Sequence, residues 1–131
     1  MYIQKLVLHD FRNVADLSVD LHPAFNIIPG ENAQGKTNFL ESIYIISTLK
    51  SFRSARNTDL VRWGTEESMI RAISHKRDVV RDLRVNIKNR SKIMSVDNKR
   101  ARSIQDTFGH LQTVLFGPED IAISKGSASY R

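Results

Sequence analysis

The sequence predicts an α/β fold with α+β character, built around a phosphate-binding P-loop. Residues 30–37, Gly-Glu-Asn-Ala-Gln-Gly-Lys-Thr, match the pattern G-x-x-x-x-G-K-[ST]. The apolar residues 25–28 precede this loop and predict a short buried strand, and the apolar residues 39–46 follow it and predict a helix. Hydrophobicity alternates with a period of two in residues 17–21 and 83–87, which predicts antiparallel strands. Strand, glycine-bounded loop and helix together form the context that a P-loop requires.

The elements before and after the loop follow from local patterns. Residues 2–8 and 14–21 predict two neighbouring strands joined by the link 10–13. Residues 36–49 predict a helix that is apolar nearly all round and therefore deeply buried. Residues 59–63 predict one helical turn, which Gly64 ends.

The second half of the chain predicts a small antiparallel meander. Residues 83–88 alternate between apolar and polar, and the apolar residues Ile93, Met94 and Val96 follow a turn near Asn89 and Arg90, so we expect one basic face toward solvent. Residues 113–116 predict a further strand. Residues 118–120 predict the first turn of a helix, because Pro118 suits an early helical position.

The P-loop residues have the chemistry that a polyphosphate needs. Gly30 and Gly35 can adopt backbone angles closed to other residues, so the loop can turn its N–H groups inward. The helix that begins near Lys36 presents unpaired N–H groups to the same anion. Lys36 would reach the β- and γ-phosphates, and the Thr37 hydroxyl would ligate Mg²⁺. The alternative is a glycine-rich turn whose Lys-Thr pair only caps a helix; the two flanks favour nucleotide binding.

Length and composition exclude several classes of protein. With 131 residues the chain can form one domain with a core, but not two. It contains no cysteine, which excludes disulfides, zinc–thiolate sites and thiol nucleophiles. The absence of disulfides suits a cytosolic protein. No apolar run approaches the ~20 residues of a membrane span, and no signal peptide is evident. We therefore expect a cytoplasmic protein with no membrane partner.

Basic residues are concentrated in one region. The net charge is +6, and residues 71–102 hold eleven Lys and Arg against three Asp. Such a concentration of positive charge is typical of proteins that bind a polyanion. A solvated hairpin face is an equal alternative explanation. Aromatic residues do not interleave these positions, which favours contact with the backbone of duplex DNA over base stacking. The candidate DNA-binding residues of this region are Arg84, Lys88, Arg90 and Lys92, with Lys99 and Arg100 on the same expected sheet.

One part of an ATPase site is missing from the sequence. A P-loop ATPase needs an acidic residue after a later apolar strand, which holds Mg²⁺ and positions water. No four-residue apolar run ending in Asp-Glu follows the P-loop. We therefore expect no catalytic residue in this chain, and interpret it as the front part of a longer protein.

Several blocks of sequence together resemble a known family. These are residues 6–13 (Leu-Val-Leu-His-Asp-Phe-Arg-Asn), the P-loop with the following residues 38–44, and residues 50–53, 60–64 and 111–121, the last containing Phe-Gly-Pro-Glu-Asp. In this order they resemble the bacterial recombination mediator family RecF, which is similar to the ATPase heads of SMC proteins in the ABC class. The resemblance covers residues 1–131.

The resemblance implies a fold and an activity. It implies lobe I of an SMC-like head, a mixed sheet with a small antiparallel meander, with the rest of the head and its arm absent. RecF-like proteins bind ATP, dimerise around two nucleotides and bind DNA in the ATP state, and slow hydrolysis releases the dimer. They act with RecO and RecR at gapped DNA to load RecA. The isolated chain would bind ATP weakly and hydrolyse it negligibly.

The resemblance also implies site residues. Gly30, Asn32, Ala33, Gly35, Lys36 and Thr37 match the P-loop, Asn38 follows directly, and Arg12 and Asn13 match a loop that approaches the nucleotide. Arg53 and Arg56 match a loop between nucleotide and DNA, where they are candidate phosphate contacts, with a solvated loop as an equal alternative. Two positions depart from the usual pattern of such heads. Ala33 replaces a common glycine, and no glutamine stands near 116–118 to contact the metal, where Glu119 or Asp120 could substitute.

Other readings remain open at this point. A metabolic P-loop phosphotransferase would need an Arg-rich helical lid, whereas the basic region here has strand periodicity. Another SMC-like DNA-repair ATPase would share most of the quoted motifs. A passive nucleic-acid module with a degenerate P-loop conflicts with the intact Lys36-Thr37 pair.

Overall fold

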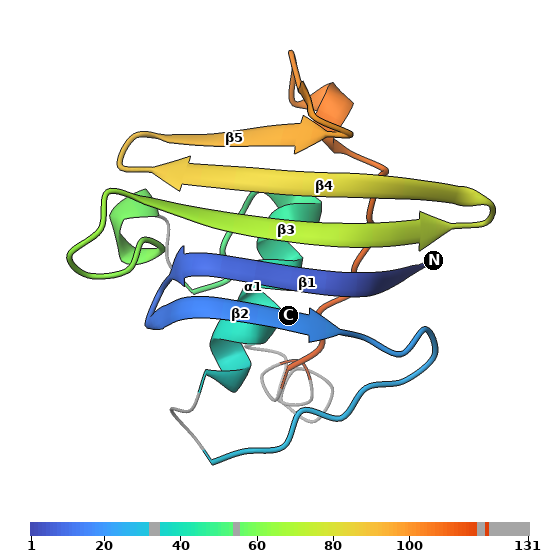
Figure 1. Cartoon of the computed structure of the whole chain (residues 1–131), viewed down its shortest axis with the longest axis horizontal. Helices are drawn as coiled ribbons and strands as arrows, with labels where there is room; N and C mark the ends of the chain where they lie inside the picture. Colours follow the sequence, from blue (N-terminus) through green and yellow to red (C-terminus); the bar gives the residue numbers. More distant parts are fainter. Residues whose placement is uncertain (32–34, 54–55, 118–119, 121–131) are drawn as a thin grey trace, which may run out of the picture.

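In the part of the chain that the structure describes, a six-stranded antiparallel sheet forms the body of the protein, with one long helix on one face (Figure 1). The computed structural model describes residues 1–31, 35–53, 56–117 and 120. The strands are β1 (Tyr2–Phe11), β2 (Val14–Asp20), β3 (Glu67–Lys76), β4 (Val79–Lys88), β5 (Ser91–Val96) and β6 (Lys99–Arg100), and their order in the sheet is β2-β1-β3-β4-β5-β6. The helix α1 spans Lys36–Thr48, and two short 3-10 turns, η1 and η2, span Asn57–Asp59 and Gln105–Thr107.

Register places the apolar residues of neighbouring strands on the same face. Leu8 pairs with Leu17 on one side and with Ile70 on the other, and Ile70 in turn pairs with Val85. Because alternate residues of a strand point to opposite faces, this row forms one continuous apolar surface. The predicted alternation in β2 and β4 is therefore confirmed.

The helix α1 covers that apolar face. Its Ile45 and Ile46 are buried with the sheet residues Leu6, Ile70 and Leu83, and together they form the core. The sequence predicts this helix over residues 36–49, and the structure confirms it to within one residue. The α+β character predicted for the fold is likewise confirmed.

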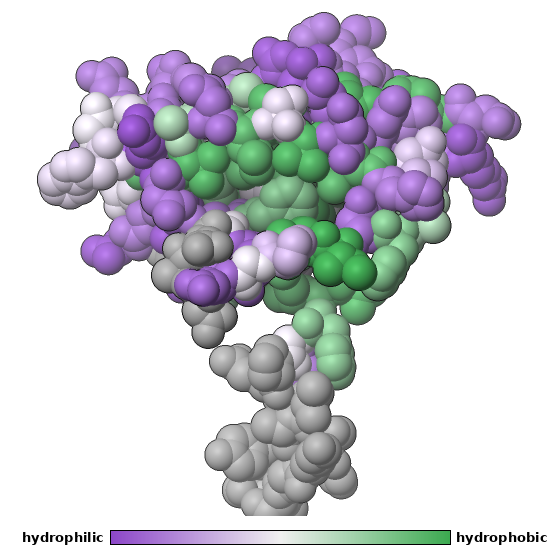
Figure 2. All heavy atoms as spheres, turned by 60° about the horizontal axis from the view of Figure 1, so that its bottom comes forward, coloured by the Kyte–Doolittle hydropathy of each residue, from purple (hydrophilic) through white to green (hydrophobic). Residues whose placement is uncertain are grey.

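Two predicted strands are absent. Residues 25–28 and 113–116 have no regular structure, and Phe25, Ile27, Val114 and Phe116 are exposed by 70% or more. A strand needs a hydrogen-bonding neighbour, and neither segment pairs with another strand of the described chain. Every pairing in the sheet is antiparallel, so the parallel part of the predicted mixed sheet is missing from this region. Figure 2 shows apolar surface exposed on the side of the molecule that these segments occupy.

Three smaller predictions had mixed outcomes. The helical turn predicted at 59–63 lies earlier, as η1, because Val61 instead forms a β-bridge with Phe11. The turn predicted at Asn89 and Arg90 is confirmed between β4 and β5. Of the helix start predicted at 118–120, residues 118 and 119 lie outside the described residues. None of the helices in the described part of the chain has the length and apolar character needed to span a lipid bilayer.

Candidate phosphate-binding site

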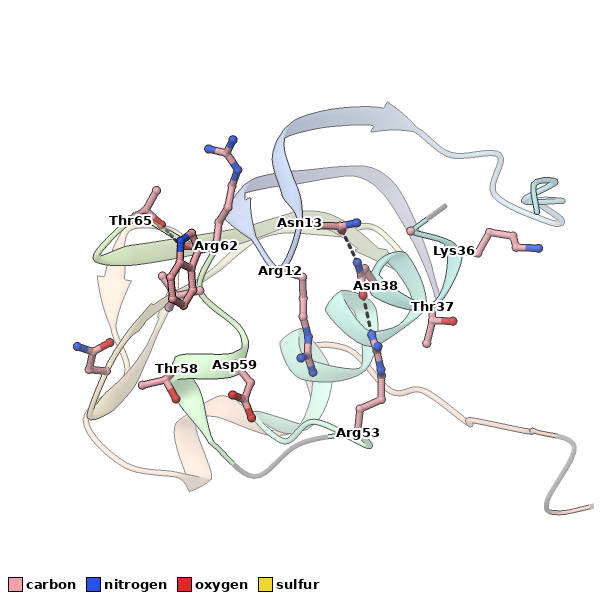
Figure 3. A pocket seen from close by; sticks show the side chains of 15 residues that line it. Arg12, Asn13, Lys36, Thr37, Asn38, Arg53, Thr58, Asp59, Arg62 and Thr65 are labelled. Carbon is pink, nitrogen blue, oxygen red and sulfur yellow. Dashed lines mark hydrogen bonds between the residues drawn. The ribbon is translucent and has the colours of Figure 1, made fainter. Parts of the chain in front are cut away.

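Three segments that are distant in sequence converge on one open pocket (Figure 3). They are the tip of the β1–β2 hairpin, the first turn of α1, and the stretch from the end of α1 to β3, and Asn89 of the β4–β5 turn completes the lining. The predicted site residues among its lining are Arg12, Asn13, Gly35, Lys36, Thr37, Asn38 and Arg53. Only the family resemblance predicts that the hairpin tip approaches the P-loop, and the structure brings Arg12 and Asn13 into the same pocket as Lys36 and Thr37.

The start of α1 is suited to an anion. Gly35 occupies the N-cap position with φ of 90°, a left-handed conformation that favours glycine, and no side chain caps this end of the helix. The first-turn N–H groups are therefore available to a ligand, together with the positive end of the helix dipole. The Lys36 Nζ donates a hydrogen bond to the carbonyl of Gly30, and Thr37 is exposed. The predicted P-loop residues Asn32 and Ala33 lie outside the described residues.

Backbone contacts hold the hairpin tip in place. Arg12 has φ of 56°, which is uncommon for a non-glycine residue, and its N–H donates to the carbonyl of Leu60 at 2.9 Å. The Nδ2 of Asn38 donates to the Oδ1 of Asn13 at 2.5 Å. The hairpin is thereby joined to the residue that directly follows the P-loop threonine.

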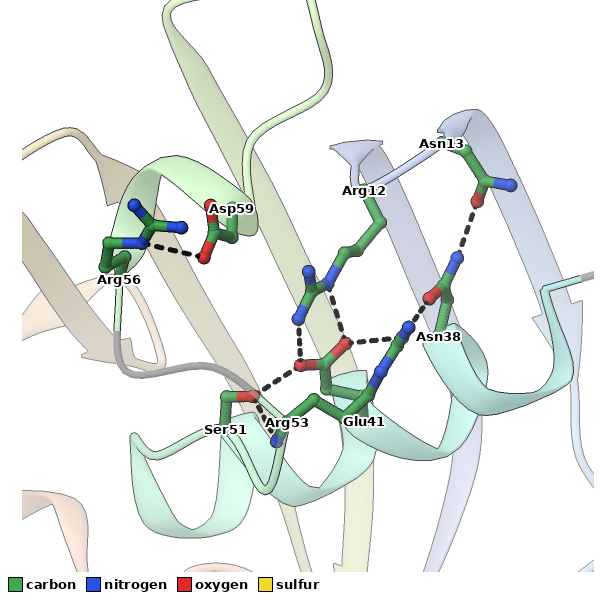
Figure 4. Close-up of polar contacts among 8 residues, drawn as sticks. All are labelled: Arg12, Asn13, Asn38, Glu41, Ser51, Arg53, Arg56 and Asp59. Atoms are coloured by element: carbon green, nitrogen blue, oxygen red, sulfur yellow. Dashed lines mark hydrogen bonds and ion pairs between the residues drawn. The ribbon is translucent and has the colours of Figure 1, made fainter. Parts of the chain in front are cut away.

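A buried carboxylate that sequence analysis missed lies behind the pocket (Figure 4). Glu41 is fully buried and accepts two hydrogen bonds from Arg12, at 2.9 Å from Nε and 2.7 Å from Nη2. Burial alone would raise its pKa, but hydrogen bonds from Arg12 and Ser51 and the charges of Arg12 and Arg53 bring the pKa below its ordinary value. Its sequence signal is that it is the only acidic residue of an otherwise largely apolar helix.

The two arginines of the following loop are placed differently. The Nη1 of Arg53 donates to the Asn38 Oδ1 at 2.6 Å and lies 3.4 Å from Glu41 Oε2, so Arg53 lines the pocket. Arg56 is 80% exposed, pairs with Asp59 at 3.2 Å, and is not part of the pocket lining. The structure thus brings Arg53, but not Arg56, to the P-loop.

The basic sheet is less uniform than predicted. Arg84 and Lys88 lie on the open face, away from α1, because they alternate with the buried residues of β4. Lys88 pairs with Glu67 at 3.2 Å, whereas Arg84 has no ion pair with any residue that the structure describes. Arg90 is exposed in the β4–β5 turn, and Lys99 and Arg100 are exposed in β6.

Lys92 does not share the open face, so the prediction that places it there is wrong. It pairs with Ile87, which is buried on the α1 side, and its Nζ donates to the carbonyl of Leu49 at 3.1 Å. Burial lowers the pKa of Lys92, and the charge of Glu41 opposes that shift. The alternation of apolar residues in β5 is imperfect, so the sequence alone misassigned the side on which Lys92 lies.

The residues present fit a phosphate ligand better than a resident metal. No group of three or more His, Cys, Asp or Glu side chains in the described chain could hold a metal ion. Mg²⁺ usually binds through one or two protein groups together with substrate phosphates, and the exposed Thr37 hydroxyl can supply such a group. The helix start, Lys36 and Arg53 supply the donors for the phosphates.

Comparison with known proteins identifies the family of the chain. A family model described as the RecF/RecN/SMC N-terminal domain matches residues 2–119. The chain belongs to this family. Relatives named DNA replication and repair protein RecF confirm the resemblance to RecF that the sequence predicts. The relative from Geotalea daltonii is 42% identical to this chain and the one from Pediococcus pentosaceus is 39% identical, each over 131 residues. The match covers all of this chain, but only 36% and 35% of those relatives.

Solved structures of the family share the fold. A structure of the recombination mediator protein RecF-ATP in the RecFOR pathway has a TM-score of 0.85 and 32% identity, and the match covers 98% of this chain and 36% of that one. A second structure, described as RecF-ATPrS, has the same TM-score and identity and covers 93% and 33%. The chain therefore spans about a third of the length of its RecF relatives.

Proposed function

We propose that this chain is the N-terminal ATP-binding lobe of an ATP-dependent DNA-binding protein of recombinational repair. The observation that carries the proposal is the pocket in which an uncapped helix start, Lys36, Thr37 and Arg53 converge. The RecF-ATP structure that the chain resembles supports ATP as the nucleotide. In this proposal, the lobe binds ATP together with Mg²⁺.

Each pocket residue has a distinct part in this proposal. The N–H groups at the start of α1 bind the phosphates, because they are oriented before the ligand arrives. The Lys36 ammonium exchanges its bond to the Gly30 carbonyl for a bond to the phosphates. Thr37 contributes its hydroxyl to Mg²⁺, and Asn38 fixes the hairpin tip through Asn13. Gly30 and Gly35 bound the loop, and Asn32 and Ala33 belong to its sequence motif.

The remainder of the activity belongs to parts that the longer RecF relatives contain. The exposed apolar segments 25–28 and 113–116 support a lobe whose sheet is extended by further chain. We propose that the complete protein dimerises on ATP, hydrolyses it slowly, binds DNA near gaps and acts with RecO and RecR in the cytoplasm. The RecF names of the relatives and their recombination pathway support this assignment.

Nucleotide binding is tested by replacing Lys36. We expect Lys36→Ala to weaken ATP binding by at least about tenfold, because a charge-assisted contact to phosphate contributes roughly 1.5–3 kcal/mol. Titration calorimetry with Mg²⁺-ATP measures the affinity. Lys50→Ala is the matched control, since Lys50 is exposed beyond the other end of α1 and does not line the pocket. Equal affinities of the wild type and Lys36→Ala would contradict the proposal.

A further inference from the structure

The only acidic side chain of α1 lies just behind the pocket and not in it. Glu41 has a fully buried side chain, yet it is absent from the residues that line the pocket. Both of its oxygens are occupied: Oε1 accepts from Arg12 Nη2 and from Ser51 Oγ, and Oε2 accepts from Arg12 Nε. A carboxylate in this state has no proton to donate and no contact with a ligand, so any effect on the ligand must pass through its partners.

The two arginines around Glu41 are held with different strength. Arg12 makes a bidentate contact, with both distances below 3.0 Å, and its side chain is only 16% exposed. Arg53 approaches the same carboxylate with one nitrogen at 3.4 Å, and its side chain is 40% exposed on the pocket side. Bidentate pairing fixes orientation, whereas a single long contact leaves most donors of the guanidinium available.

The charges around Glu41 do not balance. One carboxylate faces two guanidinium groups, and in the adjoining pocket Lys36 adds a positive charge. The carboxylate of Asp59 also lines this pocket, but it is paired with Arg56 at 3.2 Å. The contact from Arg53 to the amide oxygen of Asn38, at 2.6 Å, carries no compensating charge. The excess positive charge lies at Arg53, which contacts Asn38, the residue after Thr37, and an anion bound in the pocket would balance it.

We propose that Glu41 is a positioning residue for the nucleotide: locked by Arg12, it holds Arg53 at the P-loop so that the free donors of Arg53 meet the polyphosphate. This inference rests on the proposed function, because the ligand is the phosphate chain of that site. Beyond that function, it explains how the loop that carries Arg53, which follows α1, is held in a fixed position beside the start of α1. Asn38 and Glu41 lie three residues apart on the same side of the helix and together hold one guanidinium.

Charge and position predict opposite outcomes for one substitution. Glu41→Gln keeps the size of the side chain and removes a negative charge close to an anionic ligand, so Coulomb attraction alone would strengthen ATP binding. If Glu41 positions Arg53, the same change weakens ATP binding by about tenfold, the value of one charge-assisted contact. The direction of the change therefore separates the two roles.

A double-mutant cycle in the purified protein tests the coupling. ATP affinity is measured by calorimetry for the wild type, Glu41→Gln, Arg53→Met and the double variant, with Arg56→Met as the matched control for loss of a loop arginine. We expect Arg53→Met to weaken ATP binding about tenfold and Arg56→Met to change it by less than about twofold. When Arg53→Met is already present, adding Glu41→Gln should change the ATP affinity by less than about a further twofold. Thermal melting of each variant is recorded alongside.

The outcomes distinguish this inference from the proposed function. If the wild type and Lys36→Ala bind ATP equally, the proposed function fails. If Lys36→Ala loses binding while Arg53→Met binds as the wild type does, the positioning role is overturned, and this result does not depend on whether Glu41→Gln folds. An equal loss from Glu41→Gln in both backgrounds, accompanied by lower melting temperatures, would assign Glu41 a purely structural role and also overturn it.

Discussion

At the scale of single residues, Glu41 is the fully buried acid that contacts both Arg12 and Arg53 behind the pocket. The P-loop pattern identifies Lys36 and Thr37 because their spacing and chemistry are fixed by the ligand. Glu41 has no such pattern, since its partners come from residues 12, 51 and 53 and meet only in the fold. A buried acid within an apolar helix indicates a partner, but the sequence does not identify which one.

The pKa of Glu41 predicts how stability depends on pH. Its folded pKa lies below the ordinary value of 4.5, so its contribution is complete above about pH 4.5 and is lost as pH falls through the folded pKa. We expect the free energy of unfolding to fall more steeply from about pH 5 to about pH 3 in the wild type than in Glu41→Gln. Urea titrations at each pH measure it. The pKa of Asp97 is also lowered, but Asp97 is present in both proteins and therefore changes the pH dependence of the unfolding free energy equally in both.

Parallel curves for the two proteins over that range would contradict the account of Glu41. They would mean that its carboxylate has the same proton affinity in the folded and unfolded states, which the buried pair with Arg12 does not allow.

At the scale of elements, the β1–β2 hairpin is joined to α1 by side chains from its tip. The sequence predicts both strands and the helix from periodicity, and all three are confirmed. The side chains that connect them are two consecutive residues of a tight turn, Arg12 and Asn13, which periodicity does not describe. Local pattern thus predicts elements, while the contacts between elements need the tertiary structure.

Removing Arg12 tests this connection. We expect Arg12→Met to lower the free energy of unfolding by about 3 kcal/mol, because the fully buried carboxylate of Glu41 loses its bidentate partner. Arg62→Met is the control: its pair with Asp10, at 3.3 Å, is 43% exposed on the arginine side and is expected to cost no more than about 1 kcal/mol. Chemical denaturation measures both losses. Losses of the same size would show that Arg12 is an ordinary surface arginine.

The two faces of the sheet allow a test of the proposed DNA contact. Arg84 lies on the open face without an ion pair among the described residues, whereas Lys92 lies on the α1 face and binds the Leu49 carbonyl. In the complete protein with ATP, we expect Arg84→Gln to weaken binding to duplex DNA and to reduce the salt dependence by about one phosphate contact. Lys92→Gln should leave both unchanged. Equal effects of the two substitutions, or none from Arg84→Gln, would refute the open face as the DNA surface.

At the scale of the whole molecule, the proposed phosphate pocket lies beside an antiparallel sheet whose apolar neighbouring segments are exposed. The two strands that were predicted but not found, 25–28 and 113–116, are apolar and unpaired in the described structure. Their sequences favour strands, yet a strand forms only where a neighbour supplies hydrogen bonds. The RecF relatives, of which the chain covers about a third, have further chain that could supply such neighbours.

The most direct test of the account is a structure of the protein with Mg²⁺ and a slowly hydrolysed ATP analogue. We expect the β- and γ-phosphates within hydrogen-bonding distance of the Lys36 Nζ and of the N–H groups at the start of α1, with Arg53 turned toward the phosphates. A nucleotide bound elsewhere, with Lys36 still bonded to the Gly30 carbonyl, would contradict it.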